Sequence, residues 1–122
     1  MQTLMHFRDF VNEIMESNSR LHKQAVLKKY KDDFIVQEYL KIAFDPYMVF
    51  GISTKKLNKV VGRNEITGIN SVFGLLEYLK ANNTGSDRVI SLCQEFISNV
   101  SASDEIAADL LEELICKDLR IG

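Results

Sequence analysis

The sequence predicts an all-α protein, a compact orthogonal bundle of about seven short helices. Apolar residues recur at intervals of three and four along nearly the whole chain, which is the spacing of one helix face. Polar breaks rich in Ser, Asn, Asp and Gly divide this pattern into segments too short for a coiled coil, and no convincing strand pair is present. With 122 residues and 46% hydrophobic content, the chain fits a single domain, residues 1–122.

Three helices are expected in the first third of the chain. The first ends before residues 17–19, whose side chains compete for backbone hydrogen bonds. The second begins with Ser17 or Ser19 as its N-cap and runs to about residue 30. The third is capped by Asp32 or Asp33 and ends where Pro46 disfavours helix. The side chains expected to face inward are Leu4, Phe7, Val11, Ile14, Met15, Leu21, Ala25, Leu27, Ile35, Val36, Tyr39, Leu40 and Ala43.

The middle of the chain is less regular. Residues 47–50 are apolar and end at Gly51, and the pattern allows either one helical turn or a buried extended piece. Ser53 is the expected N-cap of a short basic helix over residues 54–61. Residues 62–65 and 67–68 are expected to form loop or turn.

Three further helices are expected after residue 69. Asn70 or Ser71 opens the first of them, in which Gly74 marks a close helix contact. Residues 82–85 form a break, and Ser86 caps the next helix. Ser103 caps the last helix. Their expected apolar stripes are Val72, Leu75, Leu76 and Leu79, then Val89, Ile90, Cys93, Ile97 and Val100, then Ile106, Leu110, Leu114 and Ile115.

No catalytic or metal-binding set stands out. His6 and His22 have no ligand spacing with Cys or with each other, and Cys93 and Cys116 accompany apolar stripes as core thiols do. Neither a phosphate-binding P-loop nor a dinucleotide-binding glycine motif occurs. No apolar run approaches the roughly 20 residues of a membrane span, so we expect no membrane partner. The N-terminus is not a secretory signal and two cysteines do not indicate an oxidising compartment, so we expect a cytoplasmic protein, of a bacterial host if it is phage-encoded. We therefore expect no catalytic residue, no metal and no cofactor in this chain.

Charge is unevenly distributed. The net charge is −2, but residues 1–62 hold 10 Lys/Arg and 7 Asp/Glu (+3), whereas residues 63–122 hold 5 and 10 (−5). Residues 20–31 contain five basic residues and no acidic one. A nearly neutral domain with such a local basic face can still bind DNA, with modest affinity.

Three loops combine polar side chains with an expected helix start, and such starts bind phosphate through free N–H groups. A basic side chain near each loop adds a charge-assisted contact. The candidate residues are Ser19, Arg20 and Lys23 in the first loop, Lys55 and Lys56 in the second, and Asn83, Thr84, Gly85, Ser86 and Arg88 in the third.

The third loop belongs to a pattern that resembles the DNA-binding domain of ATP-dependent DNA ligases. Thr84-Gly85-Ser86 opens a helix, and the chain ends in Lys117-Asp118-Leu119-Arg120-Ile121-Gly122, similar to the Leu-Arg-Ile-Gly turn of the family. The N-terminal half is similar to the small phage ligases at residues 10–14 and 23–29. The resemblance therefore spans nearly the whole chain.

The resemblance implies an all-helical domain that holds double-stranded nicked DNA through the minor groove and the phosphates beside the break. Thr84, Gly85 and Ser86 would form one phosphate loop, and Arg120 to Gly122, with Lys117 close by, a second DNA-facing turn. In the family this domain precedes nucleotidyltransferase and OB-fold domains, and the complete ligase uses ATP and Mg²⁺. The Lys-x-Asp-Gly nucleophile motif is absent here, so we expect an inactive N-terminal fragment of a longer, phage-type ligase.

Two conditions accompany this hypothesis. The Thr84 and Arg120 turns must lie on one side of the molecule, and the acidic residues 104–113 must point away from DNA. The alternative is a helical protein–protein interaction module, or a small phage regulator, that never contacts DNA.

Overall fold

The computed structural model describes residues 2–62, 66 and 68–121, and these residues form seven helices. The helices are α1 (Gln2–Ile14), α2 (Arg20–Lys29), α3 (Phe34–Phe44), α4 (Thr54–Leu57), α5 (Val72–Ala81), α6 (Asp87–Ser101) and α7 (Glu105–Ile115). No strand occurs among these residues, so the predicted all-α class is confirmed.

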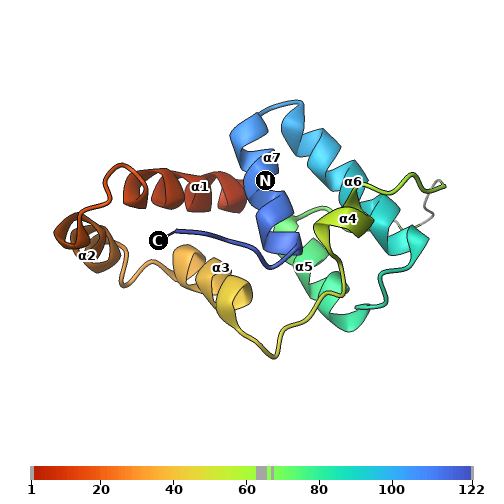
Figure 1. The fold of residues 1–122 in the computed structure, drawn as a ribbon, viewed down its shortest axis with the longest axis horizontal. Coiled ribbons are helices and arrows are strands. Elements are labelled where there is room, and N and C mark those ends of the chain that lie inside the picture. Colours follow the sequence, from red (N-terminus) through yellow and green to blue (C-terminus); the bar gives the residue numbers. More distant parts are fainter. Residues whose placement is uncertain (1, 63–65, 67, 122) are drawn as a thin grey trace.

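Helix α7 lies at the centre of the molecule, with α1, α2 and α3 toward one end and α4, α5 and α6 toward the other (Figure 1). It packs against α6 and against α1, and α1 also contacts α2 and α3. An aromatic stack crosses the core: the ring centroids of Phe7 and Tyr39 are 4.8 Å apart, and those of Tyr39 and Phe73 are 4.3 Å apart. One continuous apolar core therefore joins both ends of the bundle.

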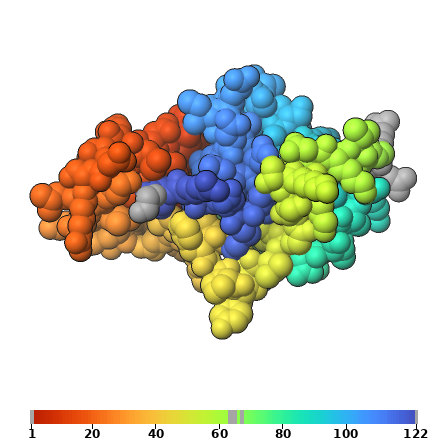
Figure 2. Space-filling model, viewed as in Figure 1, coloured from red at the N-terminus to blue at the C-terminus, as the bar shows by residue number. Residues whose placement is uncertain are grey.

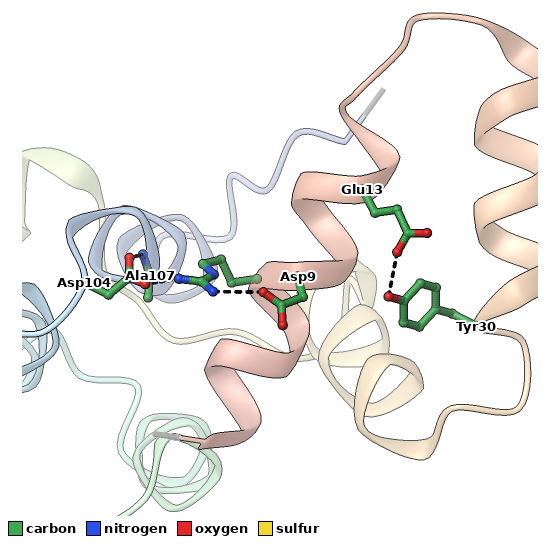
Figure 3. A network of polar contacts seen from close by, with 6 residues as sticks. Asp9, Glu13, Tyr30, Asp104 and Ala107 are labelled. Carbon is green, nitrogen blue, oxygen red and sulfur yellow. Dashed lines mark hydrogen bonds and ion pairs between the residues drawn. The ribbon is translucent and has the colours of Figure 1, made fainter.

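Most helix starts follow the predicted capping chemistry. Ser53 and Ser86 are N-caps, as expected, and the open alternatives are decided for Ser19, Asp33 and Ser71. The prediction is wrong at α7, where Asp104, not Ser103, is the cap: Asp104 Oδ1 accepts a 3.0 Å hydrogen bond from the Ala107 N–H (Figure 3). The Asp104 carboxylate also pairs with the Arg8 guanidinium of α1. This second partner holds the N-cap at Asp104, one residue after the predicted cap Ser103.

We expect Asp104→Ala to destabilise the protein by about 2 kcal/mol, because it removes both a helix cap and the partly buried partner of Arg8. Ser103→Ala is the matched control, since Ser103 is exposed and caps nothing, and it should change stability by less than about 0.5 kcal/mol. Urea denaturation followed by circular dichroism measures both. Equal effects of the two substitutions would contradict this assignment of the cap.

Helix α2 departs from its predicted stripe. Only Val26 of α2 is buried, whereas Leu21 is 77% exposed and Leu27 45% exposed. The expectation that Leu21, Ala25 and Leu27 face inward is wrong, because α2 lies at the end of the molecule and contacts α1 alone among the helices that pack closely.

Polar contacts compensate for this small apolar contact. The Tyr30 hydroxyl donates to Glu13 Oε2 at 2.7 Å (Figure 3), and Lys29 Nζ lies 2.6 Å from Glu13 Oε1. The hydrogen bond to Glu13 raises the pKa of Tyr30 to about 12. These bonds join α2 to α1.

Four smaller predictions also need correction. Met15 is exposed because it follows the end of α1 at Ile14, and Ile106 is exposed in the first turn of α7. The basic helix ends at Leu57 rather than at residue 61, because Gln94 Nε2 donates to the Leu57 and Lys59 carbonyls and so occupies acceptors at its end. A Cβ on Gly74 would lie 3.0 Å from Ser71 Oγ, so this glycine leaves room for the N-cap rather than for another helix.

Two undecided stretches have different outcomes. In residues 47–50, Tyr47 lies in a turn and residues 48–50 form no helix. Met48 and Phe50 are buried, but Tyr47 and Val49 are exposed, so the buried extended alternative is correct for only part of the stretch. Of the predicted loop, Gly62 and Gly68 lie outside helices, and residues 63–65 and 67 fall outside the described residues.

Candidate nucleic-acid interface

The second and third predicted loops meet at one corner of the molecule. Gly51 (φ +71°) and Gly85 (φ +62°) both occupy the left-handed region. A Cβ on Gly51 would lie 2.5 Å from the Asn83 carbonyl oxygen, and a Cβ on Gly85 would lie 2.8 Å from the Gly51 carbonyl oxygen. The two backbones therefore touch where glycine alone fits. We call residues 51–56 and 83–88 the α4/α6 corner.

Two helix starts face this corner. The first-turn N–H groups of a helix have no acceptor within the helix, apart from those that the cap satisfies. Ser53 Oγ accepts from the Lys56 N–H at 3.2 Å, and Ser86 Oγ accepts from the Val89 N–H at 3.5 Å. Because α4 has only 4 residues and α6 has 15, the helix dipole at the corner comes mainly from α6.

Cations surround the two helix starts. Lys56 Nζ is 3.4 Å from the Gly51 carbonyl oxygen and lies against Gly85. Lys59 Nζ pairs with Asp87 at 3.1 Å. The side chains of Lys55 and Arg88 are exposed and make no hydrogen bond or ion pair with the described residues. The structure thus brings together the predicted residues Lys55, Lys56, Asn83, Thr84, Gly85, Ser86 and Arg88.

Lys117 has a structural partner that the sequence did not indicate. Its φ of +58° turns the chain at the end of α7, and its Nζ donates to the carbonyl oxygens of Ile42 and, at 2.9 Å, Asp45. Burial lowers the pKa of this ammonium group. Lys117 therefore stabilises the end of α3. Its ammonium group is already engaged by two carbonyl oxygens and is not available to bind a phosphate at this turn.

The Arg120 side chain is 81% exposed and lies beside Asp118, with Arg120 Nε 3.3 Å from Asp118 Oδ1. Leu119 between them is buried and anchors the turn. An exposed pair of this kind contributes little to stability, so Arg120 can exchange Asp118 for another anion. Gly122, the last predicted residue of the turn, lies outside the described residues.

An acidic hollow separates α4 from this turn. Asp109, Glu112, Glu113 and Asp118 line a cavity of about 260 Å³ together with Thr54 and Cys116. Burial, with Asp118 and Asp109 nearby, raises the pKa of Glu113. The acidic residues at the C-terminal end of α7 thus lie beside Thr54, between α4 and the Arg120 turn, so the condition that they point away from DNA requires that DNA avoid this hollow.

The first predicted loop lies at the far end of the same face. Ser19 caps α2, Arg20 is exposed, and Lys23 Nζ donates to the Ile121 carbonyl oxygen at 3.1 Å. The C-terminal segment crosses the face in Figure 2 between α2 and the segment that contains α4. The C-terminal segment therefore contacts the first loop region through Lys23 and lies between α2 and α4.

A groove connects the C-terminal turn with the corner. Residues 46 and 48–53 line one wall and residues 115–117 the other, around about 420 Å³. Gly51 lines this groove opposite residues 115–117, and it also approaches Asn83. The segment around Gly51 therefore lies between the turn that precedes Arg120 and the Thr84 loop.

The remaining polar candidates are structural. His6 Nε2 lies 2.6 Å from Asp33 Oδ2, and burial raises the pKa of the Cys93 thiol to about 12, which makes it a poor nucleophile. Within the described part of the chain, no three His, Cys, Asp or Glu side chains gather as metal ligands would. None of its helices has the length and apolar character that crossing a bilayer demands.

Fold and site together define an all-helical domain with a glycine-built, cationic corner. Searches of family models, curated proteins and solved structures match nothing to this chain.

Proposed function

We propose that this chain is a DNA-binding module that grips the backbone of nicked duplex DNA, as the DNA-binding domain of a phage-type ATP-dependent DNA ligase does. The observation that carries the proposal is the α4/α6 corner, where glycine contacts place two capped helix starts and the cations Lys55, Lys56 and Arg88 together. The resemblance of the Thr84 loop and the Arg120 turn to the ligase family supports it. Nucleotidyltransferase and OB-fold domains in cis would supply ATP and Mg²⁺ chemistry.

The mechanism uses phosphate contacts only. Free N–H groups at the start of α6 and the ammonium of Lys55 bind phosphate oxygens, and neither reads a base. This suits nick sealing, which must proceed at any sequence. The acidic hollow limits the surface, because phosphates over Asp109 and Glu113 would be repelled. The phosphates therefore lie over the corner and the groove beside it, and not over the hollow itself.

We expect Lys55→Ala combined with Lys56→Ala to weaken binding to a nicked duplex about tenfold or more and to reduce the slope of log K against log salt by about two. The physical reason is the loss of two phosphate-neutralising charges. Fluorescence anisotropy with a labelled nicked duplex at two salt concentrations measures both quantities. Arg120→Ala should have a smaller effect, because Asp118 already neutralises part of its charge.

Lys28→Ala combined with Lys31→Ala is the comparison, since it removes the same charge from exposed positions at the far end of α2, within the basic stretch of residues 20–31. An equal loss in both variants would mean that the α4/α6 corner contributes no more than this basic stretch or the net charge. Binding that is absent, or insensitive to salt, would refute the proposal.

The alternative, a protein–protein interaction module, is favoured by the exposed apolar side chains of Phe44, Tyr47 and Val49. It predicts a partner captured through these residues without nucleic acid. Co-purification that survives nuclease treatment and is lost when Tyr47 is replaced by Ala would support it.

A further inference from the structure

An exposed aromatic residue stands on a turn next to the groove that leads to the α4/α6 corner. Tyr47 is 93% exposed, and its neighbours Phe44 and Val49 are 55% and 51% exposed. The segment after α3 projects from the lower edge of the molecule in Figures 1 and 2. The Tyr47 ring makes no ring contact with the described residues.

The backbone that carries Tyr47 is firmly held. The Tyr47 N–H donates to Asp45 Oδ1 at 2.9 Å, and the Met48 N–H donates to the Asp45 carbonyl oxygen at 3.1 Å. The same carbonyl accepts the hydrogen bond from Lys117, and Pro46 fixes its own φ. Buried Phe50 anchors the chain beyond the turn. The ring is therefore presented outward by a pre-organised support, and little ordering entropy is left to lose on binding.

The surroundings indicate a polyanion as the partner. Residues 41–62 contain four lysines and one acidic residue, Asp45, whose side chain already accepts a hydrogen bond within the turn. Lys59 is paired with Asp87, which leaves the charges of Lys41, Lys55 and Lys56. Pro46 and Val49 line the groove that continues to Gly51 and Ser53 at the corner. A strand held at the corner by its phosphates would extend along this groove to Tyr47.

We propose that Tyr47 stacks on a nucleobase exposed at the break in the DNA, as a base-independent contact beside the phosphate-binding corner. This inference rests on the proposed function. Every base offers an aromatic face, so such a contact adds affinity without sequence preference. At a nick the backbone of one strand is interrupted, and a base step opens there more readily than within an intact duplex. Tyr47 would thus favour broken over continuous DNA.

The test uses affinity and a fluorescent reporter. Because the chain contains no Trp, Tyr47→Trp introduces a single indole at the position in question. We expect Tyr47→Ala to weaken binding to a nicked duplex about tenfold, and to an intact duplex of the same sequence by less than about twofold. Tyr47→Phe should bind as the unaltered protein does, and the indole fluorescence of the Tyr47→Trp variant should be quenched on addition of nicked duplex.

Phe34 provides the matched control. It is 70% exposed at the start of α3, the opposite end of the helix from the turn, so Phe34→Ala should leave both affinities unchanged and Phe34→Trp should show no quenching. Circular dichroism verifies that each variant is folded.

Each contrary outcome is distinct. If the unaltered protein binds DNA and the Lys55/Lys56 variant does not, but Tyr47→Ala binds normally or loses both DNAs equally, this inference fails and the proposed function stands. If the unaltered protein does not bind DNA, both this inference and the proposed function fail. Self-association in sedimentation experiments that disappears in Tyr47→Ala would show that the turn carrying Tyr47 binds a second copy of the chain, and it would overturn the inference.

Discussion

Gly51→Ala should destabilise the protein by about 3 kcal/mol and also weaken DNA binding. The left-handed φ of +71° costs a residue with a side chain about 1–2 kcal/mol. The new Cβ would lie 2.5 Å from the Asn83 carbonyl oxygen, a backbone atom that cannot rotate away, and such overpacking costs about 1–3 kcal/mol more. Urea denaturation gives the stability, and anisotropy with a nicked duplex gives the affinity.

Two other glycines provide graded controls. Gly68 has a φ of +86° and nothing within 4 Å of its Cβ position, so Gly68→Ala should show the conformational cost alone. Gly62 also has open space, and its φ lies outside the left-handed region, so Gly62→Ala should be nearly neutral. If Gly51→Ala were no worse than Gly68→Ala, the two loops would not be in the contact that defines the corner.

Phe7→Ala should destabilise the protein by about 3–5 kcal/mol, the largest effect of any substitution considered for this chain. Phe7 is completely buried, and its ring stacks on Tyr39 at 4.8 Å and on Phe10 at 5.8 Å. Its removal leaves a cavity where α1 packs against α3. Thermal and urea denaturation measure the loss.

Phe7→Leu keeps the variant folded if the larger truncation does not. It should cost clearly less than Phe7→Ala, because most of the apolar volume is kept and only the ring contacts are lost. As a surface comparison, Phe34→Ala removes the same ring from an exposed position and should change stability by no more than about 0.5 kcal/mol. A small loss for Phe7→Ala would contradict the central place of the aromatic stack.

The two predictions separate the core from the site. Phe7 lies in the half of the molecule that holds α1, α2 and α3, whereas Gly51 lies beside α4 and α6. A protein destabilised at Phe7 but still folded should bind DNA normally. The Gly51 variant should lose affinity even under conditions where it is folded.

Local chemistry in the sequence was sufficient to predict the helices and most of their caps. Ser53, Ser71 and Ser86 each accept a hydrogen bond from an N–H three residues later, an interaction that depends on adjacent residues only. The cap of α7 shows the limit of this reasoning. The sequence predicted Ser103, but the cap is Asp104, which also pairs with Arg8, a residue 96 positions away. The exposed face of α2 has the same origin, because the neighbours of a helix decide which of its apolar residues are buried.

For the candidate site, the sequence indicated three polar loops with cations but not their distances. Their residue types and order follow from the chain, as do the all-helical class and the short connections. Tertiary packing alone joins the second and third loops through Gly51 and Gly85, turns Lys117 toward α3, and places acidic residues of α7 beside Thr54. The physical reason is range: capping and helix periodicity act over a few residues, whereas a surface is assembled from segments that only the packed core brings together.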